Sequence, residues 1–159
     1  MIFKYVALAS IIGSGALAAP LTPIDGTYEL THRVLASGKV VRPPDVRAIY
    51  TMLRGRFSLN LFFKNAKGRQ ATEASIGRFT FTPTRYCEWI EVTARVNIDR
   101  PGVTNEKPVL KNHCAPVRRA GGKYSFVAPG ENVTVTYSAN GFAARIDNGD
   151  TDYWTKIAP

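Results

Sequence analysis

The segment 123–157 constrains the fold most, because it holds short alternating runs joined by tight-turn sequences. YSFVA is followed by Pro129-Gly130-Glu131-Asn132, VTVTYS by Ala139-Asn140-Gly141, and FAARID by Asn148-Gly149 before TDYWTKI. Asn-Gly favours a type I′ hairpin turn, since both central residues of that turn need positive φ. The successive hairpins predict an antiparallel meander, and such meanders commonly close into barrels because closure removes exposed sheet edges.

The preceding part of the chain alternates in the same way and shows no long helical period. We expect strands at residues 27–35, 46–53, 57–63, 76–82 and 86–97. Residues 71–75 are predicted as a helical turn or a lead-in to the next strand. Residues 99–122 are predicted as a long loop with one short strand around Val109-Leu110. The fold class is therefore all-β, an antiparallel up-and-down barrel of about eight to ten strands.

The N-terminus predicts the compartment. A lysine at position 4 precedes an apolar run, and Ala16-Leu17-Ala18 supplies the small residues of a cleavage site. This pattern is typical of a secretory signal peptide, which we place at residues 1–18, with the mature domain at 19–159. An uncleaved N-terminal anchor is the alternative. The protein is expected to be secreted: extracellular, or periplasmic in a bacterium. No second apolar run approaches the roughly 20 residues that cross a bilayer, so no integral membrane segment is expected.

Two cysteines lie in the mature chain, and an even count in an exported protein favours a disulfide. A bond between Cys87 and Cys114 would contribute roughly 3 kcal/mol by restricting the unfolded chain. A pair of buried free thiols is the alternative. Asn132-Val133-Thr134 is a glycosylation sequon at a predicted turn, so Asn132 would carry a glycan in a eukaryotic host.

Several function classes lack their motifs. The two histidines, His32 and His113, are far apart and outside any metal-ligand spacing, so no metal is expected. Neither a nucleophile elbow nor a phosphate or dinucleotide loop occurs, so no cofactor is expected. The net charge of +9 resides largely in turns and loops. It would attract anions, but a basic groove with stacking aromatics is missing, so nucleic acid is not an expected partner.

Short motifs also resemble a known family. Gly26-Thr27-Tyr28 opens the first predicted strand, Arg54-Gly55-Arg56 precedes the third, and Tyr153-Trp154-Thr155-Lys156 ends the last. This order resembles the lipocalin-like domain of many small bacterial and fungal proteins, in which the first motif is usually Gly-Thr-Trp. Tyr28 stands here in place of that tryptophan. The resemblance implies an up-and-down barrel whose apolar interior often holds a small hydrophobic molecule, and some barrels of this kind are isomerases or cyclases.

Two polar residues are candidates for chemistry. His32 shares a predicted strand face with Tyr28 and Leu30. If that face is the lumen, His32 would bind a polar ligand group or act as an acid or base. A core histidine satisfied by its neighbours is the alternative. Glu91 would be the partner acid if its face points inward. We favour the outside for that face, with Trp89, Thr93 and Arg95, because the face with Ile90, Val92, Ala94 and Val96 is more apolar.

The apolar strand faces supply the predicted ligand site, although simple core filling is equally compatible with them. The predicted ligand-binding residues are Tyr28, His32, Tyr50, Met52, Phe57, Leu59, Tyr124, Phe126 and Tyr137. The leading hypothesis is a secreted barrel that binds a small hydrophobic or amphipathic molecule. One alternative is an isomerase, cyclase or dehydratase of a small metabolite with His32 and Glu91 as catalytic residues. Another is a protein that binds partners through its cationic loops. The oligomeric state is not predicted.

Overall fold

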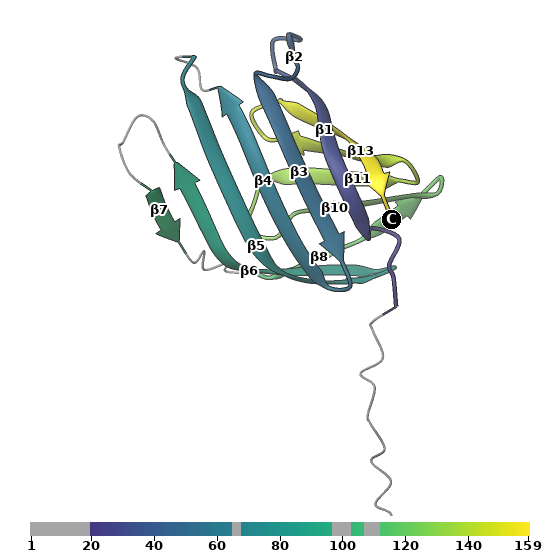
Figure 1. Ribbon diagram of the computed structural model, residues 1–159. Helices are drawn as coiled ribbons and strands as arrows, with labels where there is room; N and C mark the ends of the chain where they lie inside the picture. The colour runs from purple at the N-terminus through teal and green to yellow at the C-terminus, as the bar shows by residue number, and fades with distance from the viewer. Residues whose placement is uncertain (1–19, 65–67, 97–102, 107–111) are drawn as a thin grey trace, which may run out of the picture.

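The computed structural model describes residues 20–64, 68–96, 103–106 and 112–159, which form one antiparallel sheet of 13 strands (Figure 1). The predicted signal peptide and the predicted strand at Val109-Leu110 lie outside the described residues. The strands are β1 Gly26–Val34, β2 Val40–Val41, β3 Val46–Leu53, β4 Arg56–Lys64, β5 Gln70–Thr82, β6 Arg85–Val96, β7 Val103–Glu106, β8 Cys114–Pro116, β9 Arg118–Ala120, β10 Lys123–Val127, β11 Val133–Ser138, β12 Gly141–Ile146 and β13 Thr151–Ala158.

The sheet curls into a nearly closed barrel. Strand order runs β7-β6-β5-β4-β3-β1-β13-β12-β11-β10-β9, so the first and last long strands are hydrogen-bonded neighbours. At the other side, β8 pairs with β6 and β9 pairs with β10, and only Val117 separates β8 from β9. This short segment therefore joins β6 to β10. Figure 1 shows β10, β11 and β13 passing behind β1, β3 and β4, so the two halves enclose a common interior.

The all-β antiparallel barrel is confirmed, with differences in the irregular parts. The expected eight to ten strands become 13 because β2, β7, β8 and β9 are short elements without an alternating pattern. Residues 71–75 form no helical turn and extend β5, where they pair with β4. The segment 99–122, predicted as a loop, contains β7, β8 and β9, which pair with β6 and β10.

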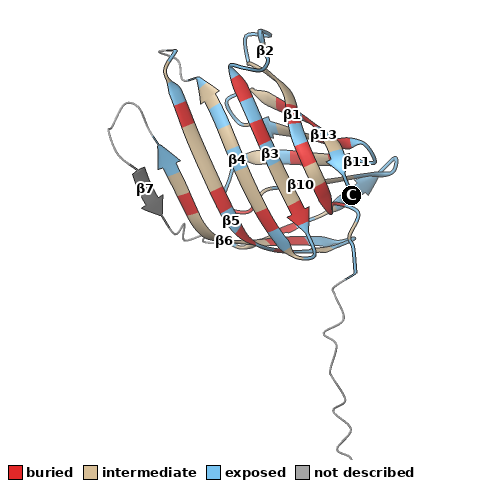
Figure 2. Cartoon of the chain, in the orientation of Figure 1, coloured by how far each residue is buried: buried red, intermediate tan, exposed pale blue. Residues whose placement is uncertain are grey.

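The packed core lies between the first strand, β3 and the C-terminal strands. Tyr28, Leu30 and Met52 are at most 1 % exposed, and Figure 2 shows buried positions alternating with others along β3. The Tyr28 hydroxyl donates to the Ile24 carbonyl at 2.9 Å, and the Tyr137 hydroxyl donates to Met52 Sδ at 3.0 Å. These bonds satisfy phenol groups that would otherwise be buried without a partner.

Two irregularities change which side chains face the interior. In β1 the register shifts between Leu30 and His32, so that Leu30 pairs with Trp154 and His32 pairs with Tyr153. In β6 the register shifts so that Ile76 pairs with Val92 whereas Gly77 pairs with Ile90. Each bulge inserts one residue, and one extra residue moves every later side chain of that strand to the opposite face.

Gly77 is required at the second bulge by close packing. A Cβ at this position would lie 2.3 Å from the Trp89 carbonyl oxygen and 2.5 Å from the Phe57 ring. Such distances exclude any side chain without displacement of the backbone. The absence of a side chain therefore lets the Phe57 ring pack directly against β5.

The disulfide between Cys87 and Cys114 is present. The two cysteines occupy paired positions of β6 and β8. The bond thus fastens the short β8–β9 segment to the sheet at the point where that segment completes the barrel wall.

We expect removal of this bond in the C87S/C114S double variant to lower the free energy of unfolding by roughly 3 kcal/mol, because the unfolded chain regains loop entropy. Urea unfolding followed by tryptophan fluorescence measures the change. The same titration on reduced wild-type protein is the control and should give a similar loss. Equal stability of oxidised and reduced protein would contradict a structural role for the bond.

Candidate functional site

The barrel encloses a cavity of about 460 Å³. Its walls come from both halves of the sheet, with Phe57, Leu59 and Leu61 on β4 facing Val133 and Val135 on β11. The inward positions of β4 are apolar at every second residue, which is the pattern expected of a strand with one face on the interior. A cavity of this size, with apolar and aromatic walls and a set of charged and polar side chains among them, has the character of a small-molecule site.

Aromatic rings form a continuous wall of the cavity. Tyr86 stacks on Phe126 with ring centroids 4.2 Å apart, and Phe126 lies 6.0 Å from Tyr137. The series continues through Phe142, whose centroid is 4.8 Å from that of Tyr137 and 5.1 Å from that of Trp154. The rings thus cover a path from β6 across β10, β11 and β12 to β13. Because these rings pack against each other, the wall is fixed before any ligand arrives.

Two ion pairs lie in the cavity wall. Arg33 on β1 makes two hydrogen bonds to Asp152 on β13, from Nε to Oδ1 at 2.5 Å and from Nη2 to Oδ2 at 2.7 Å. Arg95 on β6 donates from Nε to Oε2 of Glu73 on β5 at 2.9 Å. Both arginines therefore have a carboxylate partner. For Arg33 and Asp152, which are 17 % and 8 % exposed, this pairing offsets much of the cost of burying charge, whereas Arg95 is half-exposed and keeps contact with water.

Glu88 on β6 is a third acidic residue of the cavity. The Tyr86 hydroxyl donates a hydrogen bond to its Oε2 atom. No ion pair to Glu88 occurs among the described residues. Burial raises the pKa of Glu88 to about 7, the Tyr86 hydrogen bond opposes the rise, and repulsion from Glu131 adds to it. Near neutral pH this carboxyl is therefore divided between its protonated and ionised forms.

Glu131 lies in the turn between β10 and β11 and also faces the cavity, beside Gly130. Both residues are exposed, so the turn forms part of the cavity rim. Desolvation raises the pKa of Glu131, repulsion from Glu73 adds to this effect, and attraction to Arg95 opposes it. Two carboxyl groups at different depths of the cavity thus have raised pKa values.

The polar groups of the aromatic wall stay uncharged. Burial raises the pKa values of Tyr50, Tyr86 and Tyr137 well above the usual range, so their hydroxyls keep their protons at physiological pH. The Trp154 Nε1–H is buried and has no hydrogen-bond partner among the described residues. The cavity therefore combines neutral donors with carboxyl groups, and it can bind a molecule that carries both an apolar body and a polar group.

Of the predicted ligand-binding residues, Tyr50, Phe57, Leu59, Phe126 and Tyr137 line the cavity. Their strands bring together positions that are far apart in the sequence. Whether they contact a ligand stays a prediction.

The remaining aromatic and apolar candidates lie elsewhere. Tyr28 and Met52 belong to the packed core and do not reach the cavity. Tyr124 packs edge-on against Phe81, with ring centroids 5.4 Å apart, and Arg119 lies over its ring at 5.5 Å. Tyr28 and Met52 contact Tyr137, so they support the cavity wall from the packed core. Tyr124 does not line the cavity either.

The expectation that His32 points into the lumen is corrected by the bulge in β1. His32 does not line the cavity, and its ring stacks on Tyr153, which is 40 % exposed, with centroids 4.6 Å apart. The next residue, Arg33, takes the inward position and pairs with Asp152. A strand with unbroken alternation would have placed His32 on the same side as Leu30, and the extra residue reverses this.

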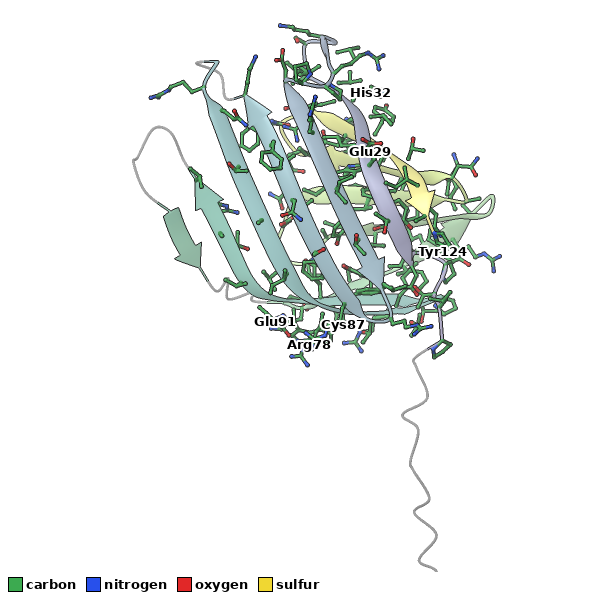
Figure 3. All side chains as sticks on the ribbon, in the orientation of Figure 1. Glu29, His32, Arg78, Cys87, Glu91 and Tyr124 are labelled. Atoms are coloured by element: carbon green, nitrogen blue, oxygen red, sulfur yellow. A yellow bond between two sulfur atoms is a disulfide. The ribbon has the colours of Figure 1, made fainter. Side chains whose placement is uncertain are left out.

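The structure places Glu91 on the outer surface, in ion pairs with Arg56 at 2.8 Å and Arg78 at 3.0 Å. Figure 3 shows Glu91 and Arg78 beside each other beneath the sheet, away from the interior. Thr93 and Arg95, which we also expected outside, line the cavity because the bulge follows Ile90. His32 and Glu91 therefore do not meet in the cavity, and the carboxyl on the inward face of β6 is that of Glu88.

Sequence reasoning missed Glu88, Glu131, Arg33 and Asp152. The period-two pattern does contain a signal for Glu88, because it shares a face with Ile90, which we expected to face inward. A glutamate on an otherwise apolar inward face is an expensive placement, and such placements mark functional candidates. Asp152 likewise shares an unbroken inward face of β13 with Trp154. Arg33 depends on the bulge in β1, and Glu131 depends on the geometry of a turn.

The part of the chain that the structure describes holds no group of three or more residues arranged to bind a metal ion. Within the same residues, no helix is long and apolar enough to cross a membrane.

Together the fold and site define a nearly closed antiparallel barrel with an internal cavity that combines aromatic walls and partly neutral carboxyl groups. No protein-family model matches the chain, and no curated protein matches it. Among solved structures, it is similar to a lipocalin-like protein from Bacteroides uniformis ATCC 8492, at 14 % identity and a TM-score of 0.38. That similarity covers 86 % of this chain and 100 % of the other. The barrel assignment rests on the strand pairing above.

We expect the stability of the E88Q variant relative to wild type to increase as pH rises. The folded-state pKa of Glu88 is about 7, above its ordinary value of 4.5, so between these values the folded protein keeps a proton that the unfolded chain loses. The contribution of Glu88 to the stability of the wild-type protein therefore decreases as pH rises from about 4.5 to about 7. The stability of E88Q relative to wild type should be roughly 1–3 kcal/mol greater at pH 8 than at pH 5.

Urea unfolding at the two pH values measures this difference. E91Q is the matched control, because Glu91 lies on the same strand but faces solvent, and its difference from wild type should change little with pH. An E88Q difference that is the same at both pH values would show that Glu88 is well solvated.

Proposed function

We propose that the protein is secreted and binds a small hydrophobic or amphipathic molecule inside the barrel. The cavity carries this proposal: about 460 Å³ of space within a folded domain, with aromatic and aliphatic walls. A barrel whose only task was stability would fill its interior with side chains, since each void forfeits packing contacts. Because an empty cavity lowers stability without a structural benefit, we infer that it is kept to hold a ligand.

The compartment is supported by two features. The disulfide between Cys87 and Cys114 is of a kind that persists in oxidising environments, and residues 1–18 have the pattern of a signal peptide. Asn132 is exposed at the β10–β11 turn, which is compatible with glycosylation in a eukaryotic host. Membership of the lipocalin-like family stays a prediction that rests on the short sequence motifs.

A polar end to the ligand follows from the distribution of polar groups. Leu59, Leu61 and Val135 supply surface for an apolar body, whereas Tyr86 and Glu88 supply hydrogen-bonding groups on β6. A purely apolar ligand would leave the Glu88 carboxyl without compensation for lost water. An amphipathic molecule complements both regions. Its polar group would lie near Glu88 and not near His32, where we expected it from the sequence.

Blocking the cavity tests this function. We expect L59W to weaken binding of the neutral dye N-phenyl-1-naphthylamine at least about tenfold, because the indole would occupy space that now lies open beside the aromatic wall. Dye fluorescence measured against protein concentration gives the dissociation constant. N60W is the matched control, since Asn60 is the adjacent, exposed position of β4. Failure of the wild-type protein to bind the dye, or equal binding by L59W and N60W, would overturn the proposal.

An enzyme that isomerises, dehydrates or cyclises a small metabolite is the second candidate. One observation favours it: Glu88 has a pKa of about 7 inside a largely apolar cavity. A carboxyl with such a pKa can take or give a proton near neutral pH, and general acid–base catalysis is most effective under that condition. Tyr86, which hydrogen-bonds Glu88, would orient the carboxyl. Glu88 thus replaces His32 and Glu91 as the catalytic candidate.

A model reaction tests this capacity. In the elimination of 5-nitrobenzisoxazole, a base removes the C3 proton, the C–H electrons complete a nitrile, and the N–O bond breaks to release a phenolate. We expect wild-type protein to accelerate this reaction with a rate that rises through about pH 7, because the base must be ionised. Absorbance of the phenolate follows it. E91Q should keep the rate and E88Q should lose it; retention by E88Q, or no rate above an equal carboxylate concentration, would contradict the assignment.

A further inference from the structure

Charge inside the cavity is opposite in sign to that of the whole chain. The chain carries a net charge of +9. The charged side chains that line the cavity are two arginines and four acids: Arg33 from β1, Glu73 from β5, Glu88 and Arg95 from β6, Glu131 from the β10–β11 turn, and Asp152 from β13. With all four acids ionised, the interior has an excess of two negative charges. The field that a ligand meets inside the barrel is therefore unlike the field of the outer surface.

The excess is located at Glu88 and Glu131. Arg33 is held by Asp152 through two hydrogen bonds, and Arg95 is paired with Glu73. Glu131 is close enough to Arg95 to feel its attraction, but no salt bridge joins them. Among the described residues, the Glu88 carboxyl receives a hydrogen bond from the Tyr86 hydroxyl and has no salt-bridge partner. An anionic ligand would meet two arginines whose charge is already balanced by a carboxylate, together with two carboxyl groups that repel it.

The aromatic wall supplies apolar surface beside the acidic groups. Tyr50, Tyr137, Phe142 and Trp154 line the same cavity as Glu88. The rings from Tyr86 to Trp154 pack on one another, so they offer a rigid apolar surface to the body of a ligand. The cavity therefore combines surplus carboxylate charge with apolar surface, and an amphipathic cation complements both.

We infer that the ligand is an organic cation, an amine or quaternary ammonium with an apolar body, held with its charged group at Glu88 and its body on the aromatic wall. This inference rests on the proposed binding function and adds the class of ligand. The cation supplies the counter-charge that Glu88 lacks, and Glu131 at the rim contributes attraction as the cation enters. Arg33 and Arg95 keep their own partners and are not displaced.

Binding of such a cation should increase with pH. A cation pairs with the ionised form of Glu88, and burial holds the pKa of that carboxyl at about 7. The ionised fraction rises about tenfold between pH 6 and pH 8. The ionisable neighbours are those named above, His113, whose Nδ1 lies 3.1 Å from the Glu88 carbonyl oxygen, and the phenols of Tyr50, Tyr86 and Tyr137, which stay protonated over this range.

Three probes with one apolar chain test the inference: decyltrimethylammonium, decanol and decanoate, each below its aggregation concentration. Each displaces N-phenyl-1-naphthylamine from wild-type protein, and the displacement constant is measured at pH 6 and pH 8. We expect the cation to bind at least about tenfold more tightly than decanol at pH 8, with its advantage reduced at pH 6. A quaternary ammonium has no proton to lose, so any pH dependence belongs to the protein.

Variants locate the effect. E88Q should abolish the advantage of the cation over decanol while decanol still binds, and E131Q should reduce it in part. E91Q, on the outer face of β6, should behave as wild type. Equal binding of cation and decanol, tighter binding of decanoate, or an unchanged advantage in E88Q would each overturn the inference and leave the binding function intact. Absence of dye and decanol binding would instead overturn the binding function itself.

Discussion

Pairing between β1 and β13 is the constraint on which the cavity depends. The first and last long strands of the domain become neighbours, with Leu30 opposite Trp154 and Arg33 opposite Asp152. Closing so long a segment of chain costs entropy, and that cost is offset only when many contacts form together. The pairing gives the sheet its curvature around an interior. It also places Arg33 against Asp152, so the closure itself compensates two of the charges in the cavity wall.

The barrel could be predicted from the sequence because strand alternation and turn residues are local features of the chain. Strand β3 has the predicted bounds, and the hairpins of β10–β13 follow from turn residues such as Gly149, which adopts a φ of 93°. The short strands β8 and β9 could not be predicted in this way. Their residues have no alternating pattern, and they become strands only because β6 and β10 offer free edges on either side. Such strands are created by tertiary structure, which local propensity does not contain.

The candidate site was predictable only where the strands are regular. Phe57 and Leu59 were placed correctly by alternation, since β4 pairs with its neighbours without a register shift. His32 and Arg95 were misplaced because a bulge precedes each of them, and a single inserted residue exchanges the two faces of a strand. Gly77 is the local indication of the second bulge, but its meaning depends on the Phe57 ring and the Trp89 carbonyl, which belong to two other strands.

Glu88 takes part in both functions that we propose for the cavity, cation binding and acid–base catalysis, but in a different protonation state for each. A cation bound beside this carboxyl stabilises its ionised form and returns its pKa toward the ordinary range, because an opposite charge offsets desolvation. The same carboxyl beside a neutral ligand keeps a pKa near 7 and can exchange protons at physiological pH. Tight cation binding and acid–base catalysis therefore require different charges on the occupant. In a cavity whose arginines are both engaged, the charge of the ligand decides whether Glu88 serves as a counter-ion or as a proton-transfer group.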